Sequence, residues 1–180
     1  MNVKKQFMAG IMAALFAFGY SAFAQGGAGA PSDPQIVGIV TTANQIDIDA
    51  AKLALKKSKN DQVKQFAKQM VDDHTSLQKS VNDLGAKLGV KPEPSDTSKA
   101  LKSAAADETK KLQGLKGSAF DSEYVNHEVA YHQQVIDAVG KVLIPNAKNA
   151  ELKSALQGAA PLFQGHLEHA QKLQSSLGGK

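Results

Sequence analysis

Five ionisable side chains of types that ligate transition metals occupy positions where the sequence pattern otherwise places apolar residues. They comprise three histidines and two carboxylates: Asp47, His74, Glu128, His132 and His166. Each stands in a row of apolar residues that recur every three or four positions, which is the spacing of one face of a helix. Such a row, here called a seam, faces the core of a helical bundle. Because burying an unpaired ionisable group is costly, each of the five must be paired, bound to a metal or near an opening.

Neutral imidazoles together with a carboxylate suit Zn, Cu, Fe, Mn or Ni, and the ligand types alone do not select one of these metals. A single core histidine is more often a hydrogen-bonded structural residue than a ligand. Three histidines and two carboxylates spread over four seams are harder to explain in that way. The sequence therefore predicts a transition-metal site, with structural pairing of the histidines and acids as the alternative.

The most regular seam predicts a helix from Asp61 to Leu88, ended by Gly89. Successive seam residues are separated by 4, 3, 4, 3, 4, 3 and 4 positions: Val63, Ala67, Met70, His74, Leu77, Val81, Leu84 and Leu88. A similar row carries Asp47 in a helix that starts at Gln35, and Ser58 to Asn60 form the turn between these helices. The two helices form a hairpin.

A second hairpin is predicted near the C-terminus. One helix runs from Phe120 to about Leu143, is broken by Pro145-Asn146 and carries Glu128 and His132 on its seam. The last helix runs from about Asn149 to Leu177 with His166 on its seam. A loop from Val90 to Thr97 and a modest helix from about Ser98 to Leu115 connect the hairpins. This order predicts an all-α fold, a ferritin-like four-helix bundle of two antiparallel hairpins joined by a crossover containing a short helix.

Helix rise predicts the depth of the polar residues within each hairpin. Asp47 lies 12 residues before Lys59 and His74 lies 15 after it, which is ~18 and ~22 Å along the axis. His132 lies 13 residues before the loop from Pro145 to Ala150 and His166 lies 16 after it, or ~20 and ~24 Å. The two polar residues of each hairpin are therefore level, while the relative height of the hairpins stays open.

Residues beside the seams are weaker candidates. His127 falls one position off its seam, and His169 could face the same interior as His166 or lie on the helix flank. Asp72 and Asp73 adjoin His74, and one of them could orient its ring. For Asp72 a solvated helix face is preferred. Neither a Gly-x-Ser-x-Gly elbow nor a His-Glu-x-x-His or Glu-x-x-His motif occurs, so the sequence does not indicate an enzyme class.

The amino-acid composition excludes some kinds of metal site and argues against nucleic acid as a partner. The chain of 180 residues is 42% hydrophobic and contains no Cys, which excludes disulfides and thiolate metal sites. It carries 21 basic residues, all of them lysine, against 17 acidic ones. Without arginine and with few aromatic side chains, the chain is not expected to bind nucleic acid.

The N-terminus has the three-part layout of a secretory signal peptide. Lys4 and Lys5 precede an apolar run of 14 residues from Phe7 to Tyr20, and Ala22-Phe23-Ala24 follows as a cleavage site. The run is shorter than the roughly 20 residues of a membrane span, so a cleaved signal is favoured over an anchor. We expect a signal peptide over residues 1–24, a Gly/Ala/Pro linker over 25–34 and the helical domain over 35–178. The mature chain would be periplasmic or secreted, with no stable membrane span.

Four stretches of this sequence resemble one family. They are Asp47 to Ala54 (DIDAAKLA), Phe66 to Thr75 (FAKQMVDDHT), Phe120 to Tyr124 (FDSEY) with His132-Gln133, and Pro161 to Leu167 (PLFQGHL). In this order they are similar to the exported bacterial domain-of-unknown-function 4142 family, which is assigned to the ferritin-like superfamily. Where the family typically has Glu in its first helix, this chain has Asp47. The resemblance implies the fold and export, but no activity.

Export predicts a defined mature N-terminus. If signal peptidase cleaves after Ala24, the intact mass of the exported protein will correspond to a chain that starts at Gln25, with or without cyclisation to pyroglutamate. Mass spectrometry of the protein recovered from the periplasm or medium measures this. A mature chain that keeps Phe7 to Tyr20 would show that the segment is an uncleaved anchor.

Overall fold

The computed structural model describes residues 29–178, and no β-strand occurs within this range. The expected signal peptide and the first residues of the expected linker lie outside the described residues. In the described range no helix combines the length and apolar character that crossing a bilayer would need. The elements, in chain order, are α2 (Asp33–Lys57), α3 (Asp61–Leu88), α4 (Asp96–Gly114), α5 (Gly117–Ala138), the π-helical turn η1 (Val139–Leu143), α6 (Ile144–Asn146) and α7 (Ala150–Gly178).

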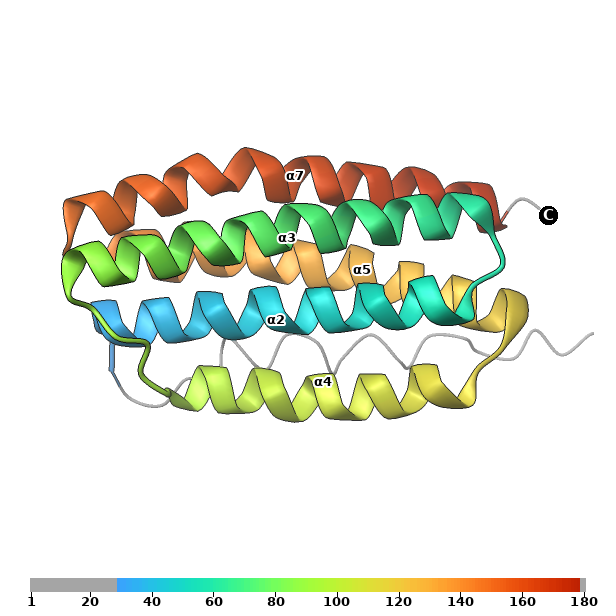
Figure 1. Ribbon diagram of the computed structural model, residues 1–180, viewed down its shortest axis with the longest axis horizontal. Coiled ribbons are helices and arrows are strands. Elements are labelled where there is room, and N and C mark those ends of the chain that lie inside the picture. Colours follow the sequence, from blue (N-terminus) through green and yellow to red (C-terminus); the bar gives the residue numbers. More distant parts are fainter. Residues whose placement is uncertain (1–28, 179–180) are drawn as a thin grey trace, which may run out of the picture.

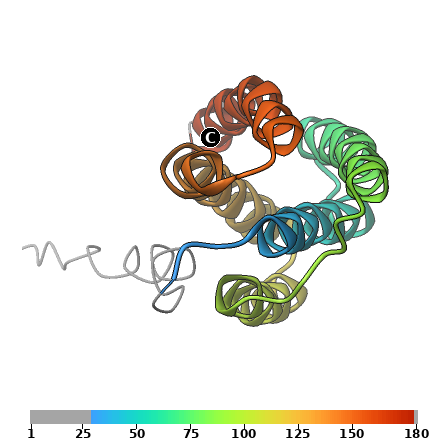
Figure 2. The same cartoon turned by 90° about the vertical axis from the view of Figure 1, so that its left-hand side faces the viewer.

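Four long helices run side by side as two hairpins, α2 with α3 and α5 with α7 (Figure 1). The view along the bundle shows these four around a shared interior, with α4 outside them against α2 (Figure 2). The prediction of an all-helical bundle is confirmed. The crossover from α3 to α5 contains α4, whose bounds agree within two residues with the helix predicted from about Ser98 to Leu115. It is shorter than α3 and α7 (Figure 1).

Polar side chains fix where the helices begin. The Ser32 hydroxyl accepts from the Gln35 N–H while the Gln35 side chain accepts from the Ser32 N–H, a reciprocal cap. At the start of α3 the Asn60 side-chain oxygen accepts from the N–H groups of Gln62 and Val63, and Gly89 ends that helix with a φ of 65°. The predicted bounds of α3 are therefore confirmed at both ends. The cap at Ser32, with Pro34 in the first turn, starts α2 at Asp33, two residues before the expected Gln35.

The second hairpin turns later than the sequence predicts. Beyond Ala138 the chain stays helical through Asn146, so Pro145 lies within a helical turn and does not end the helix at Leu143. The Ile144 N–H bonds to the Val139 carbonyl, five residues back, which widens the turn before the proline. A proline has no N–H and its ring would clash with the carbonyl four residues back in a regular α-helix, and a widened turn relieves that clash.

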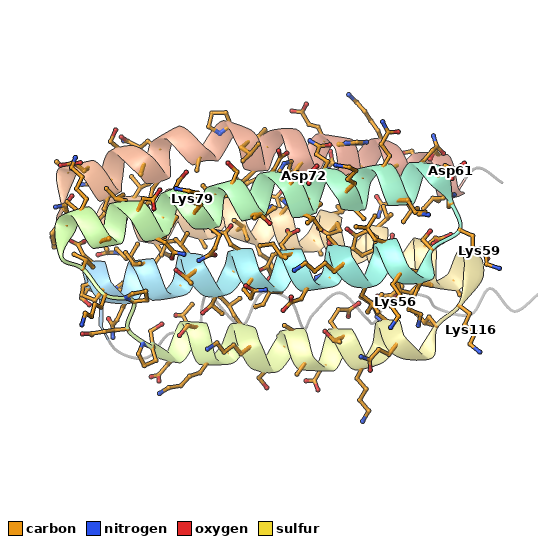
Figure 3. The ribbon with its side chains drawn as sticks, in the orientation of Figure 1. Lys56, Lys59, Asp61, Asp72, Lys79 and Lys116 are labelled. Atoms are coloured by element: carbon orange, nitrogen blue, oxygen red, sulfur yellow. The ribbon has the colours of Figure 1, made fainter. Side chains whose placement is uncertain are left out.

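Charged side chains lie on the outside of the bundle, as the labelled lysines and aspartates of Figure 3 illustrate. Inside are two apolar clusters. One surrounds Phe66, Phe120 and Tyr124, and the other is formed by the first half of α2 with the facing parts of α5 and α7. The polar seam residues lie between these two clusters, near the middle of the helices. The core is thus divided into two apolar halves by a polar layer.

Long-range hydrogen bonds close one end of the bundle. The Asp33 carboxylate, at the start of α2, accepts from the N–H groups of Lys148 and Asn149 at 2.8 and 2.9 Å, just before α7 begins. The loop after α3 also returns to α2, where the Glu93 N–H donates to the Pro34 carbonyl at 2.9 Å. The bonds of Asp33 join the two hairpins at the end where α2 starts, and the bond of Glu93 fixes the loop after α3 to the same end.

Gly38 allows this loop to approach α2. A Cβ atom added at Gly38 would lie 2.1 Å from the Glu93 carbonyl oxygen, so the Gly38→Ala substitution must displace the loop backbone. Replacing glycine by alanine inside a helix normally stabilises by about 1 kcal/mol, but overpacking costs about 1–3 kcal/mol. We expect Gly38→Ala to lower the free energy of unfolding in urea. Gly158→Ala, at a helical glycine with open space around it, should raise it. Equal gains in both variants would contradict the close approach.

Candidate metal centre

The five predicted site residues meet at one level of the bundle interior. Asp47 comes from α2, His74 from α3, Glu128 and His132 from α5, and His166 from α7. All five are buried, with at most 3% of the residue exposed. The level match within each hairpin is as predicted, and the structure adds that the two hairpins align with each other.

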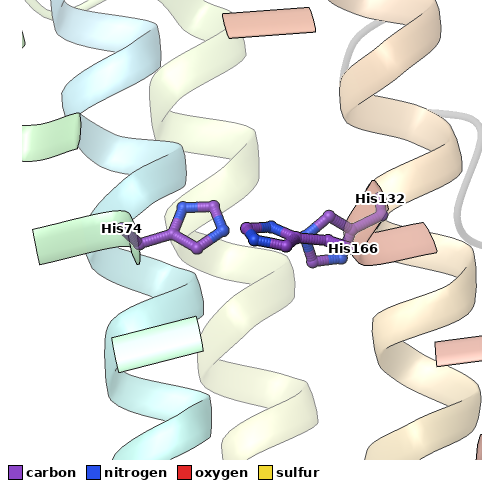
Figure 4. A group of neighbouring side chains, drawn as sticks. All are labelled: His74, His132 and His166. Carbon is purple, nitrogen blue, oxygen red and sulfur yellow. The ribbon is translucent and has the colours of Figure 1, made fainter. Parts of the chain in front are cut away.

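The three imidazole rings converge from three different helices (Figure 4). The ring centroids of His74 and His132 lie 5.7 Å apart, those of His74 and His166 5.2 Å, and those of His132 and His166 5.3 Å. One ring nitrogen from each histidine lies within 4.8 Å of the others. A group of this size can close around a single ion after small side-chain movements, because Zn–N bonds are about 2.0–2.1 Å long.

Each ring is held by a hydrogen bond from one of its nitrogens. His74 Nδ1 lies 2.9 Å from the Asn44 side-chain oxygen, and His166 Nε2 lies 2.9 Å from Asp73 Oδ2. His132 Nδ1 lies 3.0 Å from the main-chain oxygen of Glu128. All three partners are oxygen acceptors, so in the neutral rings the bonded nitrogen carries the hydrogen.

The remaining nitrogen of each ring then has a free lone pair. These atoms, His74 Nε2, His132 Nε2 and His166 Nδ1, are buried and have no hydrogen-bond partner within residues 29–178. In each ring the bonded nitrogen is here called the outer nitrogen and the unpartnered one the inner nitrogen. A ring that donates from one nitrogen to an oxygen and keeps the other free has the arrangement found in metal-bound histidines. Buried polar groups without a partner are uncommon, and three in one cluster of rings require a common explanation.

The two carboxylates lie beside this group. Asp47 Oδ2 is 3.4 Å from His74 Nε2 and 3.5 Å from His132 Nε2. Glu128 Oε2 is 3.4 Å from His132 Nδ1. Both oxygens of each carboxyl have no hydrogen-bond partner among the described residues. Asp47, Glu128 and His132 also form a second group whose ligand atoms lie within 4.8 Å, so His132 is common to both.

Burial controls the protonation of these groups. It raises the pKa of Glu128 to about 8, and burial followed by the nearby Glu128 carboxyl raises the pKa of Asp47 well above its usual range. Burial, then the neighbouring His132 and His166, lower the pKa of His74 to about 2. The pKa of His166 is also lowered, mainly by burial. The rings of His74 and His166 are therefore neutral at pH 7, which is the form that binds metals.

Two residues that bond the histidine rings, Asp73 and Asn44, differ from the sequence-based prediction. The expectation that Asp72 or Asp73 orients His74 is wrong, because Asp73 contacts His166 across the bundle and Asp72 pairs with Lys68 on the surface. Asn44 orients His74 instead. Its position three residues before Asp47, on the same face of α2, was the available signal.

The two other histidines lie outside the group. The His169 ring packs edge-on against Phe66 at 5.1 Å, and its Nδ1 lies 2.9 Å from the Gln69 side-chain oxygen. The His127 ring stacks on Tyr131 at 5.4 Å. His169 therefore lies on the helix flank, and His127 lies beside the core.

The profile of the family described as "Domain of unknown function (DUF4142)" matches residues 19–173, and the chain belongs to this family. No curated protein matches the chain significantly. Among solved structures, the chain is similar to "CopM in the Cu(II)-bound form", with 16% sequence identity and a TM-score of 0.63. The match covers 81% of this chain and 98% of that one, and at this identity it shows a shared fold.

The raised pKa of Glu128 predicts a pH dependence of stability. The folded chain keeps a proton on this carboxyl up to about pH 8, whereas the unfolded chain releases it near the ordinary pKa of 4.5. The difference in proton affinity between the folded and unfolded chains stabilises the folded state. This stabilisation is fully present below pH 4.5 and is lost as the pH rises to about 8.

Glu128→Gln copies the neutral carboxyl and removes this titration. Its stability relative to wild type should therefore grow across that range, by up to ~1.4 kcal/mol per pH unit. Urea unfolding of both proteins in chelator measures the difference. Parallel pH profiles would show that Glu128 is not protonated by burial.

Proposed function

We propose that this member of the DUF4142 family is an exported, ferritin-like protein that binds a transition-metal ion in its core. His74, His132 and His166 would hold the ion, and Asp47 or Glu128 would complete the set of ligands. The observation that carries the proposal is the clustering of three rings, each bonded to an oxygen through its outer nitrogen and unpartnered at its inner nitrogen. A single cation would give all three inner nitrogens a partner.

The donor set limits the kind of metal. Neutral imidazoles with a carboxylate suit Zn, Cu, Fe, Mn or Ni. The structural similarity to a protein solved in a Cu(II)-bound form makes copper the first ion to test, together with zinc. When bound, such an ion would supply Lewis acidity, and redox chemistry as well if it is copper, iron or manganese.

Some residues of the chain would bind the ion and others would orient the histidine ligands. Asn44 and Asp73 fix the rings of His74 and His166 through their outer nitrogens, and Asp73 would also make His166 more basic. Asp47 and Glu128 would lose their protons on binding, because a cation favours the charged form of a carboxyl. Because burial keeps these carboxyls protonated in the metal-free protein, binding would release protons and be stronger at neutral than at acidic pH.

The ferritin-like assignment is supported by the chain path. Two helical hairpins, joined by a crossover that contains α4, place ligand-type residues of four helices at one level of the core. The Glu-x-x-His pairs of di-iron proteins are absent from the sequence, and Glu128 and His132 are four residues apart. We therefore propose binding of an ion without assigning a reaction.

Export rests on the N-terminal sequence. Residues 1–24 carry the basic, apolar and small-residue segments of a signal peptide. In the periplasm or outside the cell the protein would meet metal ions that are not buffered by the cytosol. The processing experiment tests this part of the proposal independently of metal binding.

A non-catalytic interaction or stress-response protein is the second candidate. In it the buried histidines and acids would be structural partners of one another. The 2.9 Å contact between His166 and Asp73 favours this reading, because such a pair is stable without a metal. It leaves the inner ring nitrogens and both oxygens of Asp47 and Glu128 without partners.

Thermal melts of wild type and His74→Ala distinguish the two candidates. A metal that binds only the folded state stabilises it by RT ln(1 + [L]/Kd). Wild type should therefore melt at a higher temperature with Cu or Zn than with chelator. The variant should lose this increment, because its affinity should fall by at least about tenfold. His127→Ala, which removes a histidine outside the group, should keep it.

Metal analysis of the untagged protein after dialysis gives an independent readout, with about one ion per chain expected. Wild type that binds no ion and melts at the same temperature with metal and with chelator would end the metal proposal. If His74→Ala then also melts well below wild type in chelator, the histidine is structural.

A further inference from the structure

A cavity of about 370 Å³ lies in the bundle on one side of the candidate metal centre. It occupies the interior of the half in which α2 starts and α3 ends. The wall is almost entirely aliphatic, with residues from all four long helices and from η1. Most of its polar lining groups lie at the inner end: Asn44, Asp47, His74 and His132. Ser80 lies farther along α3. Away from that end the lining contains no charged side chain.

The cavity is elongated along the bundle. Its lining runs from Val37 to Asp47 on α2 and from His74 to Leu84 on α3. Each stretch covers eleven residues, or ten steps along the helix, which is ~15 Å at the rise of an α-helix. A volume of about 370 Å³ over this length corresponds to a mean cross-section of ~25 Å². The space is therefore long and narrow, and one end meets the histidines.

An opening lies between α3 and α7. Leu77, Val81 and Leu84 follow His74 on the seam of α3, yet they are only half-buried. The facing part of α7 presents the small residues Ala155, Gly158 and Ala159 to the cavity.

Polar contacts join α3 and α7 on both sides of this opening. Lys87 pairs with Glu151 at the outer side, and Asp73 contacts His166 at the inner side. The opening therefore lies between these two contacts. Larger side chains on the facing part of α7 would close it.

A space of this size is not ordinary packing. Protein interiors hold few voids larger than a water molecule, and ligand pockets of about 300–1,000 Å³ are lined mainly by apolar side chains. Water gains little here, because it needs two to four polar partners and, apart from Ser80, these occur at the inner end. Apolar cavities stay dry and take up apolar guests.

We infer that this cavity is a binding site for one aliphatic chain of the acyl or alkyl class, which enters between α3 and α7 and lies along the bundle axis. The length and narrowness of the cavity match an unbranched chain better than a bulky ring system. The absence of charge along the wall excludes a charged group from the middle of the ligand. The inner end brings the chain terminus next to His74 and Asp47, so the site adjoins the candidate metal centre but does not depend on it.

The test uses the mature protein in chelator, so that metal binding plays no part. Isothermal titration calorimetry with 1-decanol, a neutral unbranched chain, measures occupancy of the cavity. Wild type should bind 1-decanol saturably, with one site per chain.

Two variants fill the cavity from different helices. Ala159→Phe on α7 and Ala43→Leu on α2 both enlarge residues of the lining, and each should weaken 1-decanol binding by at least about tenfold. Ala160→Phe is the matched control, because Ala160 is the next residue on α7 and does not belong to the lining. It should bind within about twofold of wild type. Circular dichroism confirms that each variant is folded.

Two outcomes would overturn the proposal: no saturable binding by folded wild type, or equal binding by the cavity-filling variants and the control. Copper and zinc titrations of Ala159→Phe separate this result from the metal proposal. Retained metal binding with lost chain binding supports two adjoining sites. Retained chain binding in a folded Ala159→Phe contradicts the assignment of the cavity, whatever the metal result.

Discussion

The burial of five ionisable side chains at one level of a helical bundle is the constraint on which the rest of the structure depends. Each such group costs free energy unless a partner offsets the loss of water. The outer nitrogens of the histidines have found partners in Asn44, Asp73 and a main-chain carbonyl. The inner nitrogens and the carboxyl oxygens have not. The polar layer therefore also determines how the helices align, because the rings can meet only when both hairpins are at the same height.

This layer separates two halves of the core that are packed differently. The half around Phe66, Phe120 and Tyr124 is filled by aromatic rings that contact one another. The other half contains mainly aliphatic residues around the cavity. The two candidate sites thus share one boundary, with an ion-type site in the layer and an apolar site beside it. A chain held in the cavity would shield the layer from water, which would strengthen electrostatic interactions there.

The seams could be predicted from the sequence because helical periodicity determines which face of each helix is buried. That is why the bounds of α3 and the equal depth of the polar residues within each hairpin follow from spacing alone. Spacing does not determine the relative height of the two hairpins, which the structure provides. Periodicity does not identify the neighbour across the interface, so the contact of Asp73 with His166 could not be predicted. It also treats every seam residue as buried. Leu77, Val81 and Leu84 are only half-buried because the residues that face them on α7 are small, which is a property of a distant segment.

The hydrogen bonds of Asp33 have a consequence for the order of folding. They connect residues 115 and 116 positions apart in the chain, whereas the turn between α2 and α3 is local. Closing a long loop costs more entropy than closing a short one, so contacts of low sequence separation form with less loss of freedom. Each hairpin is therefore expected to assemble first, and the end of the bundle at Asp33 to close last. A nascent chain could not make this contact until its final helix had begun to emerge from the ribosome.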